Sequence, residues 1–295
     1  MRIVSIGEIL FDCFQDKKVI GGAPFNFFYH VYKLTNNAEF ISRIGNDDDG
    51  KSIIDFFRKN DMNNDYIQID YEHQTGIVEV NLNENGIPNF SILPNRAYDF
   101  IILNRQITKL IDANTKLLYY GTLAQRNEVS RKTIRSMLGK NFKYFCDINL
   151  RDNHYLKSTI VDSIENADVL KLNEDELKIV SKHFSSGSFD LYSTAEKLRS
   201  KFEIDVLSVT LGDRGAILVD KSGINVQSYP AEKILDTVGA GDAYAAILCL
   251  GYLNKIPIER LNYLANKFAA GICSVKGAIP QNDEIYIQFR KEIAG

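Results

Sequence analysis

The alternation of apolar strands and helical segments from residue 117 onward restricts the folds that this chain can adopt. Short runs rich in β-branched and aromatic residues recur at 117–120, 144–151, 169–172 and 206–210, and helical patterns separate them. Such alternation is typical of a doubly wound, mostly parallel sheet with helices on both faces. We therefore expect an α/β fold, in which ligands bind at the carboxyl ends of the strands.

Composition narrows the classes of partner. With 295 residues, 45% of them hydrophobic, the chain can form one large domain with a sizeable core. A net charge of −3 with interspersed signs gives no reason to expect nucleic acid or a membrane as partner. The N-terminal residues do not resemble a signal peptide, and no apolar run reaches the roughly 18 residues of a membrane span. Four scattered cysteines without Cys-x-x-Cys spacing favour reduced thiols, so we expect a cytoplasmic protein.

A glycine-rich turn, Asp236-Thr237-Val238-Gly239-Ala240-Gly241-Asp242, lies between a strand-like stretch at 224–229 and an apolar, helix-forming run at 243–250. The start of a helix offers unpaired N–H groups and the positive end of the macrodipole, and glycines let a ligand come close. The turn therefore predicts a pocket for a phosphate or an oxyanion. A carboxylate repels an anion, so Asp242 is either a first-turn acid that stabilises the helix or a base that accepts a proton from an attacking hydroxyl.

The seven residues of this turn resemble the C-terminal signature of the ribokinase-like (PfkB) carbohydrate kinases, Asp-Thr-x-Gly-Ala-Gly-Asp, and the chain as a whole is most similar to bacterial fructokinases. The resemblance implies transfer of the γ-phosphoryl group of ATP to a sugar hydroxyl, with fructose as the favoured substrate and Mg²⁺ as cofactor. It implies Asp242 as the catalytic base. The N–H groups of Gly239, Ala240 and Gly241 would bind the transferring phosphoryl group.

A second stretch resembles the sugar-binding face of the same family. Asp12 follows a first strand at 3–7, and Gly21-Gly22-Ala23-Pro24-Phe25-Asn26 leads into a helix with proline in its first turn. The resemblance implies that Asp12, Gly21, Gly22 and Asn26 bind the sugar. Taken alone, Asp12 could be a loop acid and Asn26 a helix-surface amide.

An alternating stretch at 76–82, a turn at 83–86 and a short strand at 89–93 predict a β-hairpin. Together with the first loop it would form a small sheet, which in the resembled family is a lid over the sugar. An edge hairpin of the main sheet is the alternative. We expect a single domain over 1–295 with a lid at about 8–20 and 72–100, a homodimer formed through that lid, and a sugar contact from Tyr98, which follows the hairpin.

Residues 45–52 fit the letters of a Walker A phosphate loop, Gly-x-x-x-x-Gly-Lys-Ser. Three successive aspartates at 47–49 would repel the phosphates, which argues against that function. The same aspartates suit the N-cap and first turn of a helix that follows. We expect Lys51 to be a surface lysine.

Asp147, Asn149 and Arg151 alternate at the polar end of a strand read over 144–151, so their side chains could share one face. The run resembles the fructokinase pattern Asp-x-Asn-x-Arg, which implies that Arg151 lies near the phosphoryl group or the sugar and that Asn149 contacts the sugar. A salt bridge at the end of the strand is the alternative for Asp147.

Asn173 and Glu176 have the spacing of a capping box at the start of a helix. They also resemble the family's Asn-x-x-Glu motif, which implies a contact of Asn173 with the nucleotide and of Glu176 with Mg²⁺ through water. The two interpretations are compatible.

The resemblance extends to the nucleotide side. It implies nucleotide contacts from Thr210, Gly212, Gly215 and Asn266, although a glycine turn at 212–215 on its own indicates only a hairpin. A site for a monovalent cation such as K⁺ is implied near Asp236, Val238 and Gly277.

Two other functions stay open at this point. One is a related kinase for ribose, 2-keto-3-deoxygluconate or a nucleoside. The other is a non-catalytic relative that binds a sugar or a protein, which would have no need of the base at Asp242.

Overall fold

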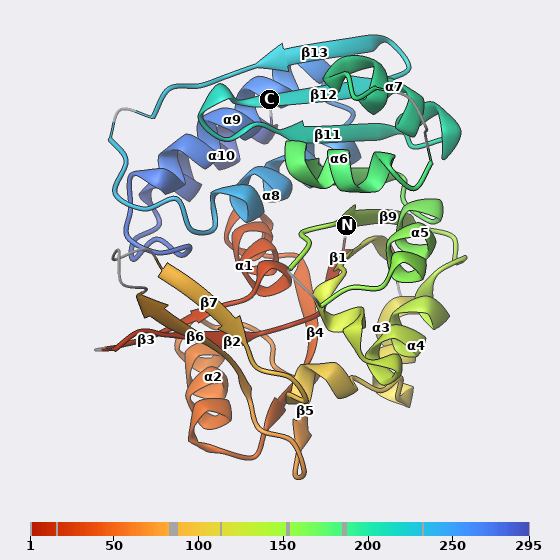
Figure 1. Ribbon diagram of the computed structural model, residues 1–295. Coiled ribbons are helices and arrows are strands. Elements are labelled where there is room, and N and C mark those ends of the chain that lie inside the picture. Colours follow the sequence, from red (N-terminus) through yellow and green to blue (C-terminus); the bar gives the residue numbers. More distant parts are fainter. Residues whose placement is uncertain are drawn as a thin grey trace.

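Two β-sheets of unequal size organise the computed structural model, which describes residues 2–15, 17–82, 88–112, 114–151, 154–184, 188–231 and 233–294 (Figure 1). The larger sheet has nine strands in the order β13-β12-β11-β10-β9-β8-β1-β4-β5. In chain order these are β1 (Arg2–Ile6), β4 (Ala38–Gly45), β5 (Ile67–Asp70), β8 (Thr115–Gly121), β9 (Lys143–Asp147), β10 (Val169–Asn173), β11 (Val206–Thr210), β12 (Ala216–Asp220) and β13 (Gly223–Gln227).

The large sheet confirms the predicted doubly wound, mostly parallel architecture. Strands β5, β4, β1, β8, β9, β10 and β11 pair in parallel, and only the β11–β12 and β12–β13 pairings within this sheet are antiparallel. Strand β1 lies between β4 and β8, so the chain leaves the first strand toward both edges of the sheet. Such a switch in strand order opens a crevice at the carboxyl ends of the strands, where ligands bind.

Helices cover both faces of the large sheet and enclose two hydrophobic cores. One core contains Phe25, Phe28, Phe40 and Phe57, and the other contains side chains such as Ile134. The first core includes residues of α1 (Ala23–Thr35), α2 (Asp48–Lys59), α8 (Ala240–Leu253), α9 (Ile258–Cys273) and α10 (Glu284–Ala294). The second includes residues of α3 (Arg105–Asp112), α4 (Glu128–Met137), α5 (Lys157–Glu165), α6 (Glu174–Ser181) and α7 (Leu191–Lys201).

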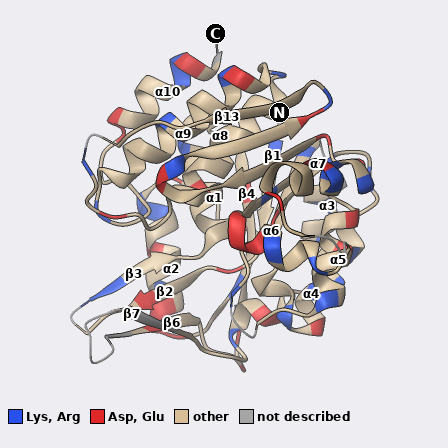
Figure 2. Cartoon of the chain, turned by 45° about the horizontal axis from the view of Figure 1, so that its top comes forward, with Lys and Arg blue, Asp and Glu red and all other residues tan. Residues whose placement is uncertain are grey.

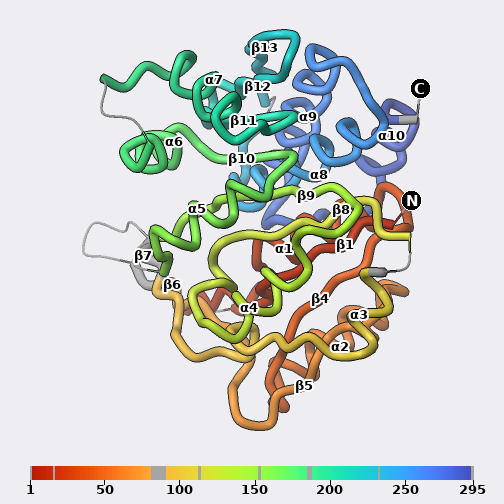
Figure 3. The backbone as a smooth tube through the Cα atoms, turned by 90° about the vertical axis from the view of Figure 1, so that its right-hand side faces the viewer, coloured from red at the N-terminus to blue at the C-terminus, as the bar shows by residue number. Residues whose placement is uncertain are grey.

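The smaller sheet stands at the carboxyl end of β1, on the left in Figure 3. Its order is β3-β2-β6-β7, with β2 and β6 parallel and the other pairs antiparallel. The predicted hairpin is confirmed as β6 and β7, and the alternative of an edge hairpin on the large sheet is wrong. The predicted turn at 83–86 lies outside the described residues. The strands are β2 (Leu10–Cys13), β3 (Lys18–Gly21), β6 (Gly76–Leu82) and β7 (Pro88–Ile92).

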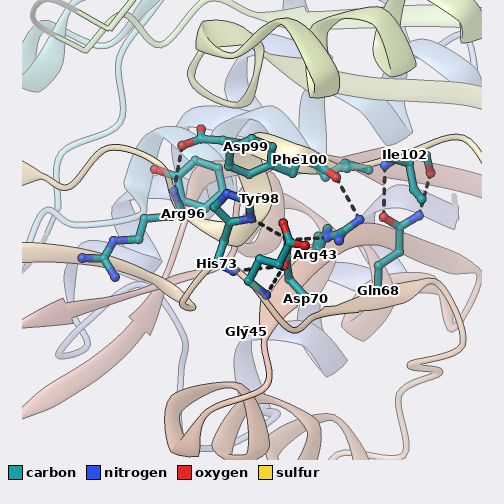
Figure 4. A network of polar contacts seen from close by, with 12 residues as sticks. Arg43, Gly45, Gln68, Asp70, His73, Arg96, Tyr98, Asp99, Phe100 and Ile102 are labelled. Atoms are coloured by element: carbon teal, nitrogen blue, oxygen red, sulfur yellow. Dashed lines mark hydrogen bonds and ion pairs between the residues drawn. The ribbon is translucent and has the colours of Figure 1, made fainter.

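A polar network fixes two of the segments that connect the small sheet to the body, those before β6 and after β7 (Figure 4). Arg43 of β4 pairs with Asp70 at 2.7 Å and donates to the carbonyl of Phe100 at 3.1 Å. Asp70 also accepts the amides of Glu72 and His73, and the His73 ring stacks on Phe100 with centroids 3.6 Å apart. The chain entering β6 and the chain leaving β7 therefore share one anchored base.

The segment 45–52 is the start of a helix, as predicted. Asp47 is the N-cap of α2, and its carboxylate accepts the amide of Gly50 at 2.7 Å. Lys51 is exposed and pairs with Asp48 at 2.9 Å. No helix in the described ranges is both long and apolar enough to cross a membrane.

One prediction about local structure is wrong. Strand β9 ends at Asp147, and Asn149 has a left-handed backbone with φ of 39°, so Asp147, Asn149 and Arg151 do not alternate along one strand face. Asparagine tolerates this conformation better than most residues. The chain turns at Asn149 and carries Arg151 to the exposed surface above the strand ends.

Candidate active site

Helix α8 begins at the glycine-rich turn. Its N-cap, Gly239, has φ of 78°, and a side chain there would be strained and would collide with Ala278. No side chain caps this helix start, and the amide of Ala240 makes a long bond of 3.3 Å to the carbonyl of Thr237. The first amides of a helix have no intrahelical partners and lie at the positive end of its macrodipole. The start of α8 is therefore suited to an anion.

Asp242 lies half-buried in the first turn of α8. Its carboxylate accepts a hydrogen bond of 2.8 Å from Nδ2 of Asn26. Loss of hydration raises the pKa of Asp242 to about 6, and the carboxylate of Asp147 adds to the rise, while Asn26, Lys171 and Arg151 oppose it. A carboxyl group with this pKa is ionised at neutral pH and can still accept a proton from a reacting hydroxyl.

Two glycines bring the start of α1 close to the residues before it. Gly22 is the N-cap of α1 with φ of 108°, and a Cβ at this position would lie 2.6 Å from the carbonyl oxygen of Glu8. A Cβ on Gly21 would lie 2.8 Å from Oδ2 of Asp12. Close approach of this kind needs glycine. The structure thus places Gly21 against Asp12, and α1 carries Asn26 to Asp242.

Arg151 acts on several acids at once. Burial raises the pKa of Asp12 to about 6, and the positive charge of Arg151 works against that rise. Burial likewise raises the pKa of Asp242 to about 6 and that of Glu8 to about 7, and the same guanidinium opposes both rises. Arg151 is therefore close enough to Asp12, Asp242 and Glu8 for its charge to act on all three acids.

Tyr98 packs against the small sheet at the start of β6. It is completely buried in the 3₁₀ turn Ala97–Phe100, and a Cβ on Gly76 would be 2.7 Å from its ring. The guanidinium carbon of Arg126 lies 5.1 Å from the centre of the ring. Tyr98 thus joins β6 to the body, and its hydroxyl is buried without a hydrogen-bond partner.

Asn173 and Glu176 form the predicted capping box at the acidic first turn of α6, red in Figure 2. Oδ1 of Asn173 accepts the amide of Glu176 at 2.8 Å, and Oε2 of Glu176 accepts the amide of Asn173 at 2.7 Å. Oε1 of Glu176 accepts a third amide, that of Leu150, at 2.7 Å. Each carboxylate oxygen keeps a further lone pair. The group therefore fits a water-mediated contact to Mg²⁺ better than direct coordination.

Besides Asn173, four residues are expected on the nucleotide side, and they come from β11, the turn after it and α9. Thr210 ends β11 beside Asn173 in the register of the sheet, and Gly212 and Gly215 follow with φ of 67° and 88°. A Cβ on Gly215 would collide with Gln227, so this glycine is needed for the turn itself. Asn266 is buried in α9, where its amide donates to Asn262 Oδ1 at 2.9 Å.

The three residues expected at a monovalent cation site are held together by one carboxylate. Oδ1 of Asp236 accepts the amide of Val238 and Oδ2 accepts the amide of Gly277, both at 3.0 Å. The loop before α8 is thereby tied to the loop after α9.

Lys171 was not predicted as a site residue. Its Nζ lies 2.9 Å from Oδ2 of Asp147, which confirms the salt-bridge alternative for that acid. The same Nζ is 3.6 Å from the position that a Cβ on Gly241 would take, so Lys171 lies beside the start of α8. Asp147 also accepts the hydroxyl of Tyr119 at 2.9 Å. Burial opposes the charge of Lys171, but Asp147 outweighs this effect and raises the pKa of the lysine. The sequence contains one signal that could have pointed to Lys171, namely a charged residue within the otherwise apolar strand 169–172.

The profile of the family described as pfkB family carbohydrate kinase matches residues 3–285. A putative sugar kinase of Pyrococcus horikoshii, PH1459, is 29% identical over 99% of this chain and 97% of its own length. A fructokinase of Klebsiella pneumoniae is 28% identical over 85% of this chain and 84% of its own.

Solved structures agree with this relationship. The crystal structure of PH1459 superposes with a TM-score of 0.83 at 26% identity and full coverage of both chains, and the same protein has been crystallised with ATP. A Vibrio cholerae fructokinase with bound fructose, ADP and potassium ion superposes with a TM-score of 0.80 at 23% identity over 97% of each chain. A 2-dehydro-3-deoxygluconokinase of Thermotoga maritima superposes with 0.79 at 18% identity over 99% of each chain. At 23% and 18% identity, the superpositions on the fructokinase and on the 2-dehydro-3-deoxygluconokinase show a shared fold.

Proposed function

The chain belongs to the pfkB family of carbohydrate kinases, and on that premise we propose that it transfers the γ-phosphoryl group of ATP to a hydroxyl of fructose. The observation that carries the proposal is the position of Asp242, in the uncapped first turn of α8 and bonded to Asn26. An acid at an anion site serves no purpose in a protein that only binds phosphate, because it repels the ligand. It serves a clear purpose where a hydroxyl must lose a proton to an acceptor beside the phosphoryl group.

In the proposed reaction the sugar hydroxyl attacks the γ-phosphorus, the bond to the bridging oxygen of ADP breaks, and the hydroxyl proton passes to Asp242. The amides of Gly239, Ala240 and Gly241 stabilise the negative charge of the transferring group. Arg151 adds a positive charge, which its effect on Asp242 supports. Phosphoryl transfer depends mostly on alignment and charge stabilisation, and these residues supply both.

Mg²⁺ would be held near Glu176 through water and would neutralise phosphate charge when bound. Asn173, Thr210, Gly212, Gly215 and Asn266 are proposed to line the nucleotide site, which the capping box and the turn after β11 support. The cradle formed by Asp236, Val238 and Gly277 is proposed for K⁺. The potassium bound to the Vibrio cholerae enzyme makes this worth testing.

The sugar is proposed to lie between the small sheet and the start of α1, where Asp12, Gly21, Gly22 and Asn26 meet, with Asn149 and Tyr98 at its margins. The small sheet would act as a lid that excludes water from the reaction. The ion pair of Arg43 with Asp70 would hold the base of β6 and β7 in place during that closure. Pairing of two such sheets in a homodimer is part of the proposal, and sedimentation at monomer mass would contradict it.

An ADP-release assay across a panel of fructose, ribose, 2-keto-3-deoxygluconate and nucleosides tests the proposed function. The account expects the highest kcat/KM for fructose. A clear preference for another panel member would replace fructose and leave the sugar-kinase activity in place. Absence of turnover with every member, while a sugar still binds in calorimetry, would favour the non-catalytic alternative.

A further inference from the structure

Glu8 is a buried acid for which the mechanism above has no use. It follows β1 at the point where the strand order of the large sheet reverses, the position at which α/β sheets bind ligands. Only 3% of its surface is exposed, and its Oε2 atom is buried without a hydrogen-bond partner. Leaving a buried carboxylate oxygen unpaired costs stability, and native proteins rarely do so without a reason.

Two further unpaired atoms lie in the surroundings of Glu8. Among the described residues, Oδ1 of Asn26 and the hydroxyl of Tyr98 are also buried without partners. Asn26 is bonded to Asp242, whose charge acts on Glu8, and the charge of Glu8 acts on Tyr98. These three buried polar atoms lack partners, and a ligand that carries several hydrogen-bonding groups, which is the chemistry of a polyhydroxylated ring, would satisfy them.

Acids outnumber free cations among the charged groups near Glu8. Glu8, Asp12 and Asp242 supply three carboxyl groups, and the positive charge of Arg151 acts on each of them. The other nearby cations already have partners.

Arg126 holds Asp99 with two bonds of 2.7 and 2.8 Å, and Lys171 holds Asp147. The surroundings of Glu8 are therefore acidic, and they disfavour a substrate that brings a carboxylate of its own.

We propose that Glu8 is an unassigned substrate-binding residue, which accepts a hydrogen bond from a sugar hydroxyl and restricts the acceptor to neutral sugars. The inference rests on the proposed kinase function and narrows its substrate class. The terminal torsion of a glutamate is soft, so a small turn of the carboxyl group presents the unpaired oxygen to the ring. Burial raises the pKa of Glu8 to about 7, and Arg151 counteracts part of this rise, so both protonation states are accessible at neutral pH.

Glu8→Gln tests the role, because it keeps the size and removes the charge. The KM for the best neutral sugar should rise roughly tenfold, the effect of losing one hydrogen bond to a charged group. The kcat and the KM for ATP should stay within about twofold, because Glu8 is not placed at the reacting atoms. The preference for the neutral sugar over 2-keto-3-deoxygluconate, as a ratio of kcat/KM values, should fall.

Two companion variants separate charge from position. Glu8→Asp keeps the charge and withdraws the carboxyl group by one methylene, so it should raise the sugar KM and keep the discrimination against the sugar acid. Glu79→Gln changes an exposed acid of the small sheet and should alter neither value. Calorimetric titration of each variant with the neutral sugar measures binding independently of turnover.

An unchanged sugar KM and an unchanged preference in Glu8→Gln would overturn the inference, as would a parent enzyme that prefers the sugar acid. Either result leaves the kinase function standing. A parent that phosphorylates no sugar contradicts the proposed function instead, and calorimetry with Glu8→Gln would then still decide whether Glu8 binds the ring.

Discussion

Strands β9 and β10 carry a lysine–aspartate pair at each end, and the two pairs differ in environment. At the amino end Lys143 bonds Asp168 at 2.6 Å and Asp205 at 3.0 Å, and the side chains of Lys143 and Asp168 are 46% and 23% exposed. At the carboxyl end Lys171 bonds Asp147 at 2.9 Å, and these side chains are 9% and 1% exposed. The same two residue types therefore form a surface cluster at one end and a buried pair at the other.

The pKa values of the acids near the two pairs differ between the two ends of the sheet. At the amino end, the hydrogen bond from Tyr252 and the bond from Lys143 outweigh burial and lower the pKa of Asp205, so charge is stabilised there. At the carboxyl end, burial raises the pKa values of Glu8, Asp12 and Asp242. Charged groups held at a cost are typical of functional sites, and this contrast marks the carboxyl end as the working end of the sheet.

The largest effect is expected from Lys171→Met. It leaves Asp147 buried with one remaining bond from Tyr119, and removing one partner of a buried pair lowers the free energy of unfolding by about 3–5 kcal/mol. Urea unfolding at pH 7.5 measures this loss. The double variant with Asp147→Asn removes the stranded charge and should recover part of the stability. A loss below about 1 kcal/mol in Lys171→Met would show that the buried pair is no more important than a surface pair.

A smaller effect of opposite sign is expected from Glu8→Gln. Burial raises the pKa of Glu8 in the folded protein to about 7, above its ordinary value of 4.5, so the folded state binds the proton more tightly. That preference stabilises the protein below about pH 4.5 and is lost as the pH rises through 7.

At pH 8 the neutral glutamine should therefore raise the free energy of unfolding by on the order of 2–3 kcal/mol, and near pH 4 the two proteins should converge. Urea titrations at both pH values provide the comparison. Equal free energies of unfolding for Glu8→Gln and the parent at pH 8 would mean that burial of the Glu8 carboxylate does not destabilise the folded protein.

The smallest effect is expected from Lys143→Met, the same substitution at the other end of the same pair of strands. Exposed pairs contribute about 0–1 kcal/mol, and salt screens them. The loss in unfolding free energy should stay below about 1 kcal/mol and shrink further in roughly 1 M NaCl. A loss as large as that of Lys171→Met would remove the distinction between the two ends.

Features set by neighbouring residues could be predicted from the sequence. The caps at Asp47 and Asn173 depend on residues three positions away, and the structure confirms both. The αL turn at Asn149 was missed because the alternating letters of 144–151 also suit a strand.

Contacts between distant segments could not be predicted in the same way. The pair of Lys171 and Asp147 depends on the register of two strands, and the influence of Arg151 on Glu8 depends on how loops from different strands meet. The resemblance to a family supplied Asp12, Asn26 and Asp242 as site residues. Only the coordinates showed that Asn26 bonds Asp242 across 216 positions of the chain.

Asp242 is proposed to accept the proton of a sugar hydroxyl at the start of α8. The decisive experiment is the turnover of Asp242→Asn at saturating ATP and fructose, with binding of both ligands checked by calorimetry. The account predicts that kcat falls by on the order of 10²–10⁴-fold while both ligands still bind. A kcat within a factor of a few of the parent, with the parent's pH profile through about pH 6 retained, would contradict it.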